Sequence, residues 1–189
     1  GGVYAFAQVR GGGEKGKNWH KEGKGLKKIN SINDFVDAAE FLIREKYTNP
    51  NKLAINGGSH GGLVVGAAMT QRPDLFKVVI SEMGRLDMAS LDKYTSGIHH
   101  FDEYGNPNNK EEFESMLSYS PYHTIKEDVN YPTCLIITSE NDDRVPPFQS
   151  YKFAVRLQNR TAQKNPIFLK VNKVAGHSGN ISSYEKRVK

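Results

Sequence analysis

The 189-residue sequence predicts an α/β domain built on a mostly parallel sheet. Five short apolar segments suited to strands alternate with segments whose apolar residues recur every three to four positions, as on one face of a helix. Several of the apolar segments are continuous, which is typical of strands buried on both faces between helices. In such a sheet ligands bind outside the carboxyl ends of the strands, so candidate functional residues are expected just after each strand.

The predicted strands are residues 3–9, 52–56, 77–82, 133–139 and 167–172. Between the first two, apolar residues recur at helical spacing and predict a helix over 32–45. Ser31 stands at the expected N-cap, and Asp34 follows three positions later in the arrangement of a capping box.

Two further helices are predicted from the same kinds of signal. One starts at the glycine-rich turn around Ser59 and ends before Pro73, and the other follows two consecutive prolines, with Phe148, Tyr151 and Val155 as its apolar stripe. Residues 84–129 interrupt the alternation as a long polar connection with one short helix near 110–117. A loop of that length in a compact domain is usually functional.

The composition excludes several classes of function. The net charge is +5, but the basic residues are scattered, and the densest stretch, residues 15–28, also contains acids and glycines. It therefore predicts a solvated loop, and we expect no nucleic-acid partner. No apolar run approaches the roughly 20 residues of a membrane-spanning helix, so we expect no membrane segment.

Cys134 is the only cysteine, which rules out a disulfide within the chain and a thiolate zinc cluster. We expect no metal or other cofactor and a reducing, cytoplasmic location, with the periplasm as the alternative. The sequence enters its first predicted strand directly after Gly1 and Gly2, without a starting methionine or the parts of a signal peptide. These features predict a piece of a longer protein.

The most specific motif is G-x-S-x-G at residues 57–61, between a predicted strand and a predicted helix. In this context the serine lies at a strained strand-to-helix turn that exposes its hydroxyl, as in the nucleophile elbow of α/β-hydrolases. Glycines at 57, 58, 61 and 62 would let the backbones approach closely enough for that turn. Ser59 is thus the candidate nucleophile, and the backbone N–H of His60, at the start of the helix, is the candidate oxyanion donor.

A serine nucleophile needs a histidine base and an acid that orients the base. Of six histidines, only His177 follows a late strand, in a loop with glycines on either side. In α/β-hydrolases the acid lies between the serine and the histidine in the chain. The turn after strand 133–139 offers Glu140, Asp142 and Asp143, and spacing alone does not choose among them.

Residues 11–16 formally fit the dinucleotide-binding pattern G-x-G-x-x-G. That function requires an amphipathic helix that begins at the loop and holds a pyrophosphate at its N-terminus. The residues that follow do not have this pattern, so nucleotide binding is not expected.

Several motifs occur in the same order in the prolyl oligopeptidase family of serine peptidases, which this sequence resembles over nearly its whole length. The resemblance implies an α/β-hydrolase catalytic domain that cleaves short peptides. The motifs are Val9-Arg-Gly-Gly-Gly-Glu14, Trp19-His20, Asn56-Gly-Gly-Ser-His-Gly-Gly-Leu63, Gln71-Arg-Pro-Asp-Leu-Phe76, Lys93-Tyr94, Glu103-Tyr-Gly105, Tyr119-Ser-Pro121, Asp142-Asp-Arg-Val145 and Ala175-Gly-His177.

The resemblance also implies residue roles. In the family's D-D-R-V motif the first aspartate is the acid of the triad and the arginine contacts the bound peptide, which points to Asp142 and Arg144 here. The family's substrate-pocket residues Tyr104 and Val145 are kept. Relatives carry a β-propeller that gates the active site, an upstream tyrosine that completes the oxyanion hole and a closing C-terminal helix. We therefore expect residues 1–189 to be a partial catalytic domain, truncated at both ends, whose partner is the propeller of the same protein.

The departures from the family concern specificity. His100 replaces a tryptophan that stacks on proline, Arg85 replaces an apolar pocket residue, and His60 replaces an asparagine. These changes predict weaker selection of proline, because proline gains most from a flat aromatic face in a dry pocket. If Arg85 points into the pocket it favours small polar or acidic residues. The alternative is that Arg85 pairs with Asp87, Glu82 or another nearby acid.

Three hypotheses of function follow. The first is a serine peptidase acting through an acyl-enzyme. The second is an esterase, because the same triad serves both reactions and the fold does not separate them. Arg144 favours the peptidase, since a cation beside the triad suits a peptide carbonyl or carboxylate. The third is a fragment that has no activity of its own.

Overall fold

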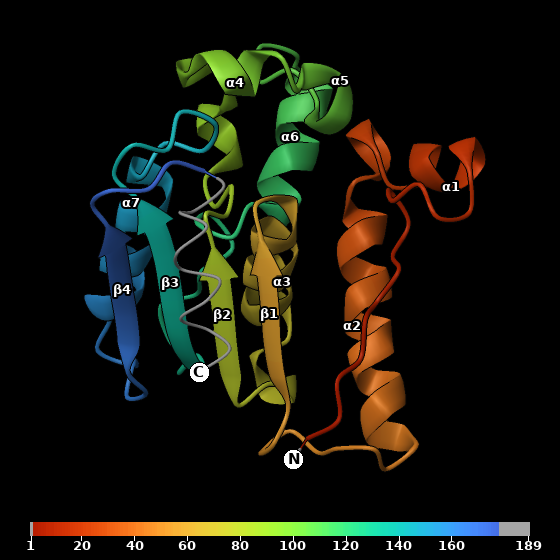
Figure 1. Cartoon of the computed structure of the whole chain (residues 1–189), viewed down its shortest axis with the longest axis vertical. Coiled ribbons are helices and arrows are strands. Elements are labelled where there is room, and N and C mark those ends of the chain that lie inside the picture. The colour runs from red at the N-terminus through yellow and green to blue at the C-terminus, as the bar shows by residue number, and fades with distance from the viewer. Residues whose placement is uncertain (1, 178–189) are drawn as a thin grey trace.

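The structure is a computed structural model, which describes residues 2–177. Its centre is a sheet of four parallel strands in the order of the chain (Figure 1). In the register, Ala54 lies opposite Val78, Val78 opposite Thr133, and Cys134 opposite Ile167. The strands are β1 (Ala54–Gly58), β2 (Val78–Glu82), β3 (Thr133–Ser139) and β4 (Ile167–Asn172).

Seven α-helices and three short 3-10 segments connect or precede these strands in the described part of the chain. The α-helices are α1 (Lys17–Lys21), α2 (Ile29–Arg44), α3 (His60–Gln71), α4 (Thr95–Ile98), α5 (Phe101–Tyr104), α6 (Lys110–Tyr119) and α7 (Phe148–Gln158), and the 3-10 segments are η1 (Gly25–Lys27), η2 (Pro73–Leu75) and η3 (Met88–Lys93). Four of the five predicted strands are therefore confirmed, with β1 displaced by two residues toward the C-terminus.

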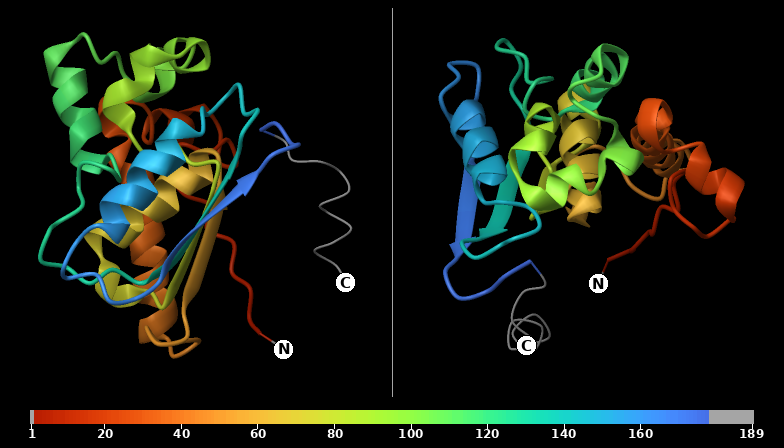
Figure 2. Two further views of the ribbon diagram at one scale, coloured as in Figure 1. Left: turned by 90° about the vertical axis from the view of Figure 1, so that its left-hand side faces the viewer. Right: turned by 90° about the horizontal axis from the view of Figure 1, so that it is seen from above.

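Helices α3 and α7 cover the same face of the sheet, and among residues 2–177 no helix covers the opposite face (Figure 2). Burial alternates accordingly along β2 and β3: Val79 and Ile136 are buried, whereas their neighbours Ile80 and Ile137 are only partly covered. The expectation of helices on both faces is not met in this part of the chain. The reason is the strand order. Each strand lies next to the preceding one in the same direction across the sheet, and right-handed connections between such strands all place their helices on the same face.

Residues 3–9 do not form a strand, contrary to the prediction. The segment runs alongside β1 and α2, and its apolar side chains are exposed, with Tyr4 at 87% and Phe6 at 73% (Figure 1). A strand needs a hydrogen-bonding neighbour, and among the described residues no strand pairs with this segment. Strand propensity without a partner therefore gives only an irregular chain.

The predicted capping box of the first long helix is also wrong. Helix α2 begins at Ile29, and Ser31 lies inside it with its hydroxyl donating to the carbonyl of Arg10 at 2.5 Å. Asp34 instead accepts two hydrogen bonds at 2.9 Å, from the backbone N–H and the Nε of Arg10. Both polar side chains tie the N-terminal segment to α2, and this tertiary role outweighs the local capping pattern.

Helix α7 buries a different face from the predicted stripe of Phe148, Tyr151 and Val155. Its buried apolar residues are Phe153, Ala154 and Leu157, and Val155 is 52% exposed. The buried face also contains Gln149, whose side-chain amide accepts from the backbone N–H of Asp87 and donates to its carbonyl. A search for apolar residues alone therefore does not find this face from the sequence.

Residues 84–129 are more ordered than the predicted loop, because they contain η3, α4, α5 and α6. Together with α2 and α3, these segments enclose a small apolar cluster above the sheet. The cluster consists of Ile32, Leu63, Ala67, Met88, Leu91, Tyr104, Met116 and Tyr119. It fixes Tyr104, and with it α5, beside the carboxyl ends of the strands.

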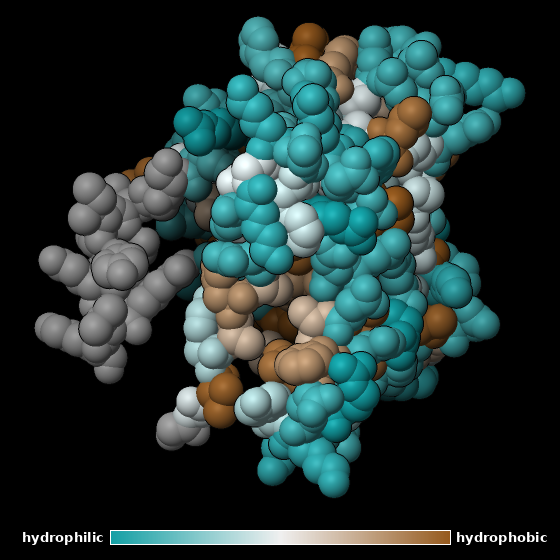
Figure 3. Space-filling model, turned by 90° about the vertical axis from the view of Figure 1, so that its right-hand side faces the viewer, coloured by the Kyte–Doolittle hydropathy of each residue, from teal (hydrophilic) through white to brown (hydrophobic). Residues whose placement is uncertain are grey.

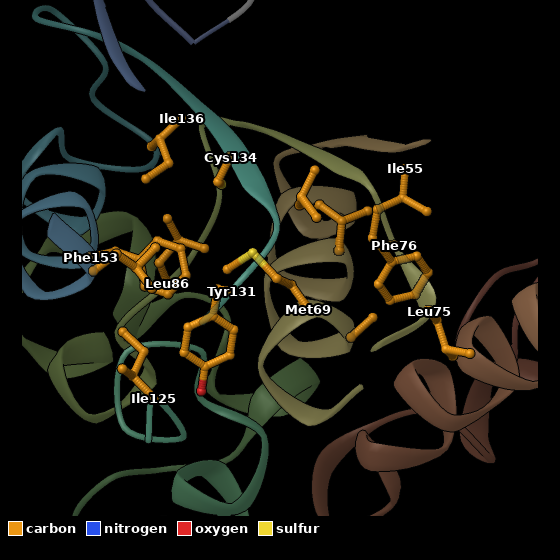
Figure 4. Close-up of a cluster of buried hydrophobic side chains, with 14 of the residues drawn as sticks. Ile55, Met69, Leu75, Phe76, Leu86, Ile125, Tyr131, Cys134, Ile136 and Phe153 are labelled. Carbon is orange, nitrogen blue, oxygen red and sulfur yellow. The ribbon is translucent and has the colours of Figure 1, made fainter. Parts of the chain in front are cut away.

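The main core lies between the sheet and helices α3 and α7 (Figure 4). Phe153 of α7 and Met69 of α3 pack against Cys134 and Ile136 of β3. Burial raises the pKa of the Cys134 thiol to about 12, so this thiol is a small apolar core residue. By contrast, the side of the molecule that carries α2 is mostly hydrophilic, with an apolar patch around a hollow in its lower half (Figure 3).

Candidate active site

Ser59 lies between the end of β1 and the start of α3, at the predicted elbow. Its backbone has φ 55° and ψ −112°, a conformation that residues with a side chain seldom adopt. The turn is held in place because the N–H of Ser59 donates to the carbonyl of Glu82 on β2 at 2.8 Å. This geometry is the strained strand-to-helix turn that the G-x-S-x-G motif predicts.

Two of the four glycines around Ser59 are required by close backbone approach. A Cβ on Gly57 would lie 2.2 Å from the carbonyl oxygen of Gly61, and one on Gly62 would lie 2.6 Å from the Cα of Gly84. Gly58 and Gly61 have room for a side chain by the same measure. The turn therefore depends on Gly57 and Gly62, whereas the sequence alone suggested all four.

Ser59, His177 and Asp142 form one hydrogen-bonded chain at the carboxyl edge of the sheet. His177 Nε2 lies 3.0 Å from Ser59 Oγ, and His177 Nδ1 lies 2.8 Å from Asp142 Oδ2. The three side chains follow β1, β3 and β4, so parallel strands bring together residues that are far apart in the sequence. The three side chains lie in the order and at the distances expected from the sequence, an arrangement that suits a nucleophile, a base and an acid that orients the base.

The structure also separates the three candidate acids. The Asp142 side chain is completely buried, and its Oδ1 accepts the backbone N–H groups of Arg144 at 3.0 Å and Val145 at 2.8 Å. Glu140 and Asp143 are exposed, and neither contacts the imidazole. Only Asp142 can hold the imidazole of His177 in one orientation and keep the proton on Nδ1.

His60 is the first residue of α3, so its backbone N–H has no acceptor within the helix. This N–H lies next to the nucleophile at the positive end of the helix dipole, as an oxyanion donor requires. The position of His60 thus agrees with the donor predicted from the sequence.

The His60 side chain belongs to a second polar group beside the nucleophile. His60 Nδ1 and the Tyr104 hydroxyl share a hydrogen bond of 3.0 Å. Burial lowers the pKa of His60 to about 4 and raises the pKa of Tyr104 to about 12, so both side chains are neutral near pH 7. The His60 imidazole is therefore uncharged, and the hydrogen bond to Tyr104 holds it in one orientation beside Ser59.

Arg85 follows β2 and is only 4% exposed. Its guanidinium donates to the Tyr94 hydroxyl at 2.8 Å and to Ser96 Oγ at 3.5 Å, and it lies 5.6 Å from the centre of the Tyr104 ring. His100 lies beside it, with 3.5 Å between the two nitrogens. The expected alternative, an ion pair of Arg85 with Asp87, Glu82 or another acid, is not seen within residues 2–177, where Asp87 pairs with Lys152 instead.

Val145 and Arg144 lie in the turn after β3 that also carries Asp142. Val145 is buried, whereas Arg144 is exposed, and both contribute backbone N–H groups to the Asp142 carboxylate. The turn thus places an apolar side chain and a cation directly next to the triad.

Sequence reasoning missed a buried ion pair that supports the Tyr104 side of the site. Lys28 is 0% exposed and pairs with Glu103, whose Oε2 also accepts a hydrogen bond from His20 Nε2 at 3.0 Å. Its ammonium lies 5.2 Å from the centre of the Tyr104 ring. The sequence places Lys28 at the end of the basic stretch 15–28, which predicts a solvated loop, and the helix is expected to start only at residue 32. The burial of Lys28 therefore follows from the observed start of α2 at Ile29.

The described residues contain neither a cluster of metal-ligating side chains nor a helix that could span a membrane. Within residues 2–177 no group of three or more histidine, cysteine, aspartate or glutamate side chains is arranged to hold a metal ion. No helix in this part of the chain is both long and apolar enough to cross a membrane.

Comparison with known proteins identifies the family. The sequence model of the prolyl oligopeptidase family matches residues 1–189. The chain belongs to the prolyl oligopeptidase family. Among curated members it is 44% identical over 179 residues to a prolyl endopeptidase of Dictyostelium discoideum and 45% identical over 184 residues to one of Elizabethkingia miricola. These alignments cover 93% and 97% of this chain but 24% and 26% of the relatives. The chain thus spans about a quarter of their length.

Solved structures of the family confirm the α/β-hydrolase fold. A structure from a mechanistic study of two prolyl endopeptidases superposes with a TM-score of 0.89 at 45% identity, covering 90% of this chain and 25% of the other. Prolyl oligopeptidase B of Galerina marginata, without ligand, gives a TM-score of 0.85 at 38% identity, covering 95% and 26%. Structures of that enzyme with bound peptide substrates include alanine variants of one serine, one aspartate and one histidine.

Proposed function

We propose that the protein is a serine peptidase that cleaves short peptides through an acyl-enzyme intermediate. The observation that carries the proposal is the hydrogen-bonded chain from Asp142 through His177 to Ser59. In this function Ser59 is the nucleophile, His177 the general base and acid, and Asp142 the residue that orients the base.

The geometry supports the following reaction. Ser59 Oγ attacks the peptide carbonyl carbon and passes its proton to His177 Nε2, while the N–H of His60 stabilises the negative oxygen. His177 then gives the proton to the peptide nitrogen, the C–N bond breaks, and the amine leaves. A water molecule attacks the resulting ester with His177 again as base. The C–O bond to Ser59 breaks, the acid is released, and the proton returns to Ser59.

The spacing of the three residues supports their assignment. In prolyl oligopeptidase B the serine and the aspartate replaced by alanine are 84 positions apart, and the aspartate and the histidine are 37 apart. Here the corresponding separations are 83 and 35 positions. The relatives named above are peptidases, which favours peptide over ester substrates for this chain. The family's β-propeller, as the partner that limits access to the site, belongs to the same proposal.

The test uses the full-length protein with an amide and an ester that share one acyl group. A peptidase hydrolyses the amide with a measurable kcat, and a fluorophosphonate labels Ser59 with one equivalent. Ser59→Ala should abolish labelling and lower kcat by several orders of magnitude. Hydrolysis of the ester without hydrolysis of any peptide amide would support the esterase and contradict the proposal.

A further inference from the structure

Arg85 is a buried cation whose charge no described residue neutralises. It is 4% exposed, and its polar neighbours are the neutral hydroxyls of Tyr94, Ser96 and Tyr104. These hydroxyls can accept N–H groups of the guanidinium, but none of them supplies a negative charge. Burying a charge without a counter-charge costs several kcal/mol, which makes such an arrangement rare unless a charged ligand completes it.

The nearest acids along the chain are engaged elsewhere. Asp87 pairs with Lys152, and its backbone is bound by Gln149. Glu82 accepts from Asn56 Nδ2 at 3.0 Å, and Asp142 is held by His177. None of these carboxylates lies within ion-pair distance of Arg85 among the residues that the structure describes.

His100 does not satisfy Arg85 either. Its Nδ1 lies 2.5 Å from the carbonyl oxygen of Ser96, and a carbonyl only accepts, so this nitrogen carries a proton. A protonated Nδ1 cannot accept the N–H of Arg85 that approaches it at 3.5 Å. His100 therefore supplies neither a negative charge nor an Nδ1 acceptor to Arg85.

Arg85 is also close to the reacting serine. It comes three residues after β2, whose last carbonyl, at Glu82, receives the backbone N–H of Ser59. The Tyr104 ring connects the two positions, because one part of it faces the guanidinium at 5.6 Å and its hydroxyl bonds the imidazole of His60. A group bound at Arg85 would therefore lie beside the residues that flank the nucleophile.

We infer that Arg85 binds a carboxylate of the peptide substrate. The inference rests on the proposed peptidase function and adds a substrate class to it. The guanidinium fork matches a carboxylate in a bidentate geometry, and the low exposure of Arg85 makes this charge pair strong. The carboxylate comes either from an aspartate or glutamate side chain at the residue whose carbonyl is attacked, or from the free C-terminus of a short peptide.

Two series of substrates for the full-length protein distinguish these sources. The first has blocked ends and differs at the cleaved residue, comparing aspartate with asparagine, glutamate with glutamine, and both with alanine and proline. The second has alanine at that position and compares a free C-terminal carboxylate with its amide. One of the two series should show a preference of about tenfold or more in kcat/KM for the carboxylate over its neutral analogue.

Three variants assign the preference to Arg85. Arg85→Gln should remove it, and Arg85→Lys should keep part of it, because the charge remains without the planar fork. Lys93→Gln is the matched control. It also removes one positive charge from the same segment, but Lys93 is exposed and paired with Asp92. Fluorophosphonate labelling of Ser59 in each variant verifies a folded site.

The outcomes separate this inference from the peptidase proposal. If no peptide is cleaved and Ser59 is not labelled, the proposed function fails. If alanine or proline peptides are cleaved but neither series prefers the carboxylate, the role of Arg85 is wrong while the peptidase stands. A preference that persists in Arg85→Gln also overturns it. If Arg85→Gln does not fold, the test compares the unmodified protein with Arg85→Lys. The ratio of kcat/KM for the carboxylate substrate over its neutral analogue should be smaller in Arg85→Lys, and an equal ratio in both proteins would overturn the inference.

Discussion

The backbone N–H of Val145 donates to Asp142 Oδ1 at 2.8 Å, on the carboxylate that orients His177. This contact fixes the carboxylate in place, and both of its oxygens face His177 Nδ1, Oδ2 at 2.8 Å and Oδ1 at 3.0 Å. The neighbouring Asp143 is exposed and has no comparable role.

Asp142→Asn should therefore lower kcat by about 10³-fold to 10⁴-fold, because the amide favours the wrong tautomer of His177. Asp143→Asn removes the same charge one position away and is the matched control, with a change expected within about threefold in the absence of such a contact. Steady-state kinetics on one peptide substrate compare the two. Similar losses at both positions would contradict the assignment of the acid.

The strained backbone of Ser59 predicts that glycine at this position gives a more stable protein than alanine. Ser59→Ala and Ser59→Gly both remove the nucleophile, but only glycine relaxes φ 55° and ψ −112° without steric cost. Ser59→Gly should therefore be more stable than Ser59→Ala by about 1 kcal/mol, after the entropy of glycine is taken into account. Thermal unfolding midpoints measure this difference. A glycine variant less stable than the alanine variant would show that the turn is not strained.

His60 predicts a loss of stability in mild acid. Its folded pKa of about 4 lies below the ordinary value of 6.5, mainly because of burial. Between these values the unfolded chain binds a proton that the folded chain excludes, so stability falls as the pH falls through this window. The expected loss between pH 7 and pH 5 is about 2 kcal/mol.

His60→Gln should flatten this dependence, whereas His99→Gln should leave it unchanged, because His99 is exposed. The measurement is the thermal unfolding midpoint of the three proteins between pH 7 and pH 5. A parallel acid shift in all three would assign the effect to other groups.

The buried pair of Lys28 and Glu103 predicts an asymmetric response to mutation. Glu103→Gln leaves the Lys28 ammonium buried without a counter-charge and should cost about 3 kcal/mol. Lys28→Met should cost less, because Glu103 is partly exposed and keeps its contact with His20. Glu22→Gln, which breaks the exposed pair with Lys27, is the control and should change stability by less than about 1 kcal/mol. Equal costs for Glu103→Gln and Glu22→Gln would refute the buried charge.

The sequence was sufficient for the parts of the molecule whose signals are local. The strand after Tyr131, the helix after Ser59 and the elbow between two glycines each follow from a short pattern and its neighbours. The triad follows as well, because the rule that functional groups come after strands places Ser59 and His177 at one edge. The choice of Asp142 over Asp143 needed either the family resemblance or the observed burial.

Other features depend on contacts between distant segments, which a local pattern does not contain. Residues 3–9 have the composition of a strand, but none of the four described strands pairs with them. Asp34 has the spacing of a capping residue, yet Arg10 is the stronger partner. Arg85 lies in a segment predicted to be a polar loop, and only the folded structure shows that it is buried without an ion pair to any acid within residues 2–177.

The order of the strands has a consequence for how the protein acquires activity. Ser59 and His177 are separated by 118 positions and meet only when β1 and β4 occupy the same sheet with β2 and β3 between them. Contacts between such distant positions form late, because the chain must first close a long loop. During refolding, reactivity of the serine should therefore appear after the helical signal, and a covalent serine probe reports the completed sheet.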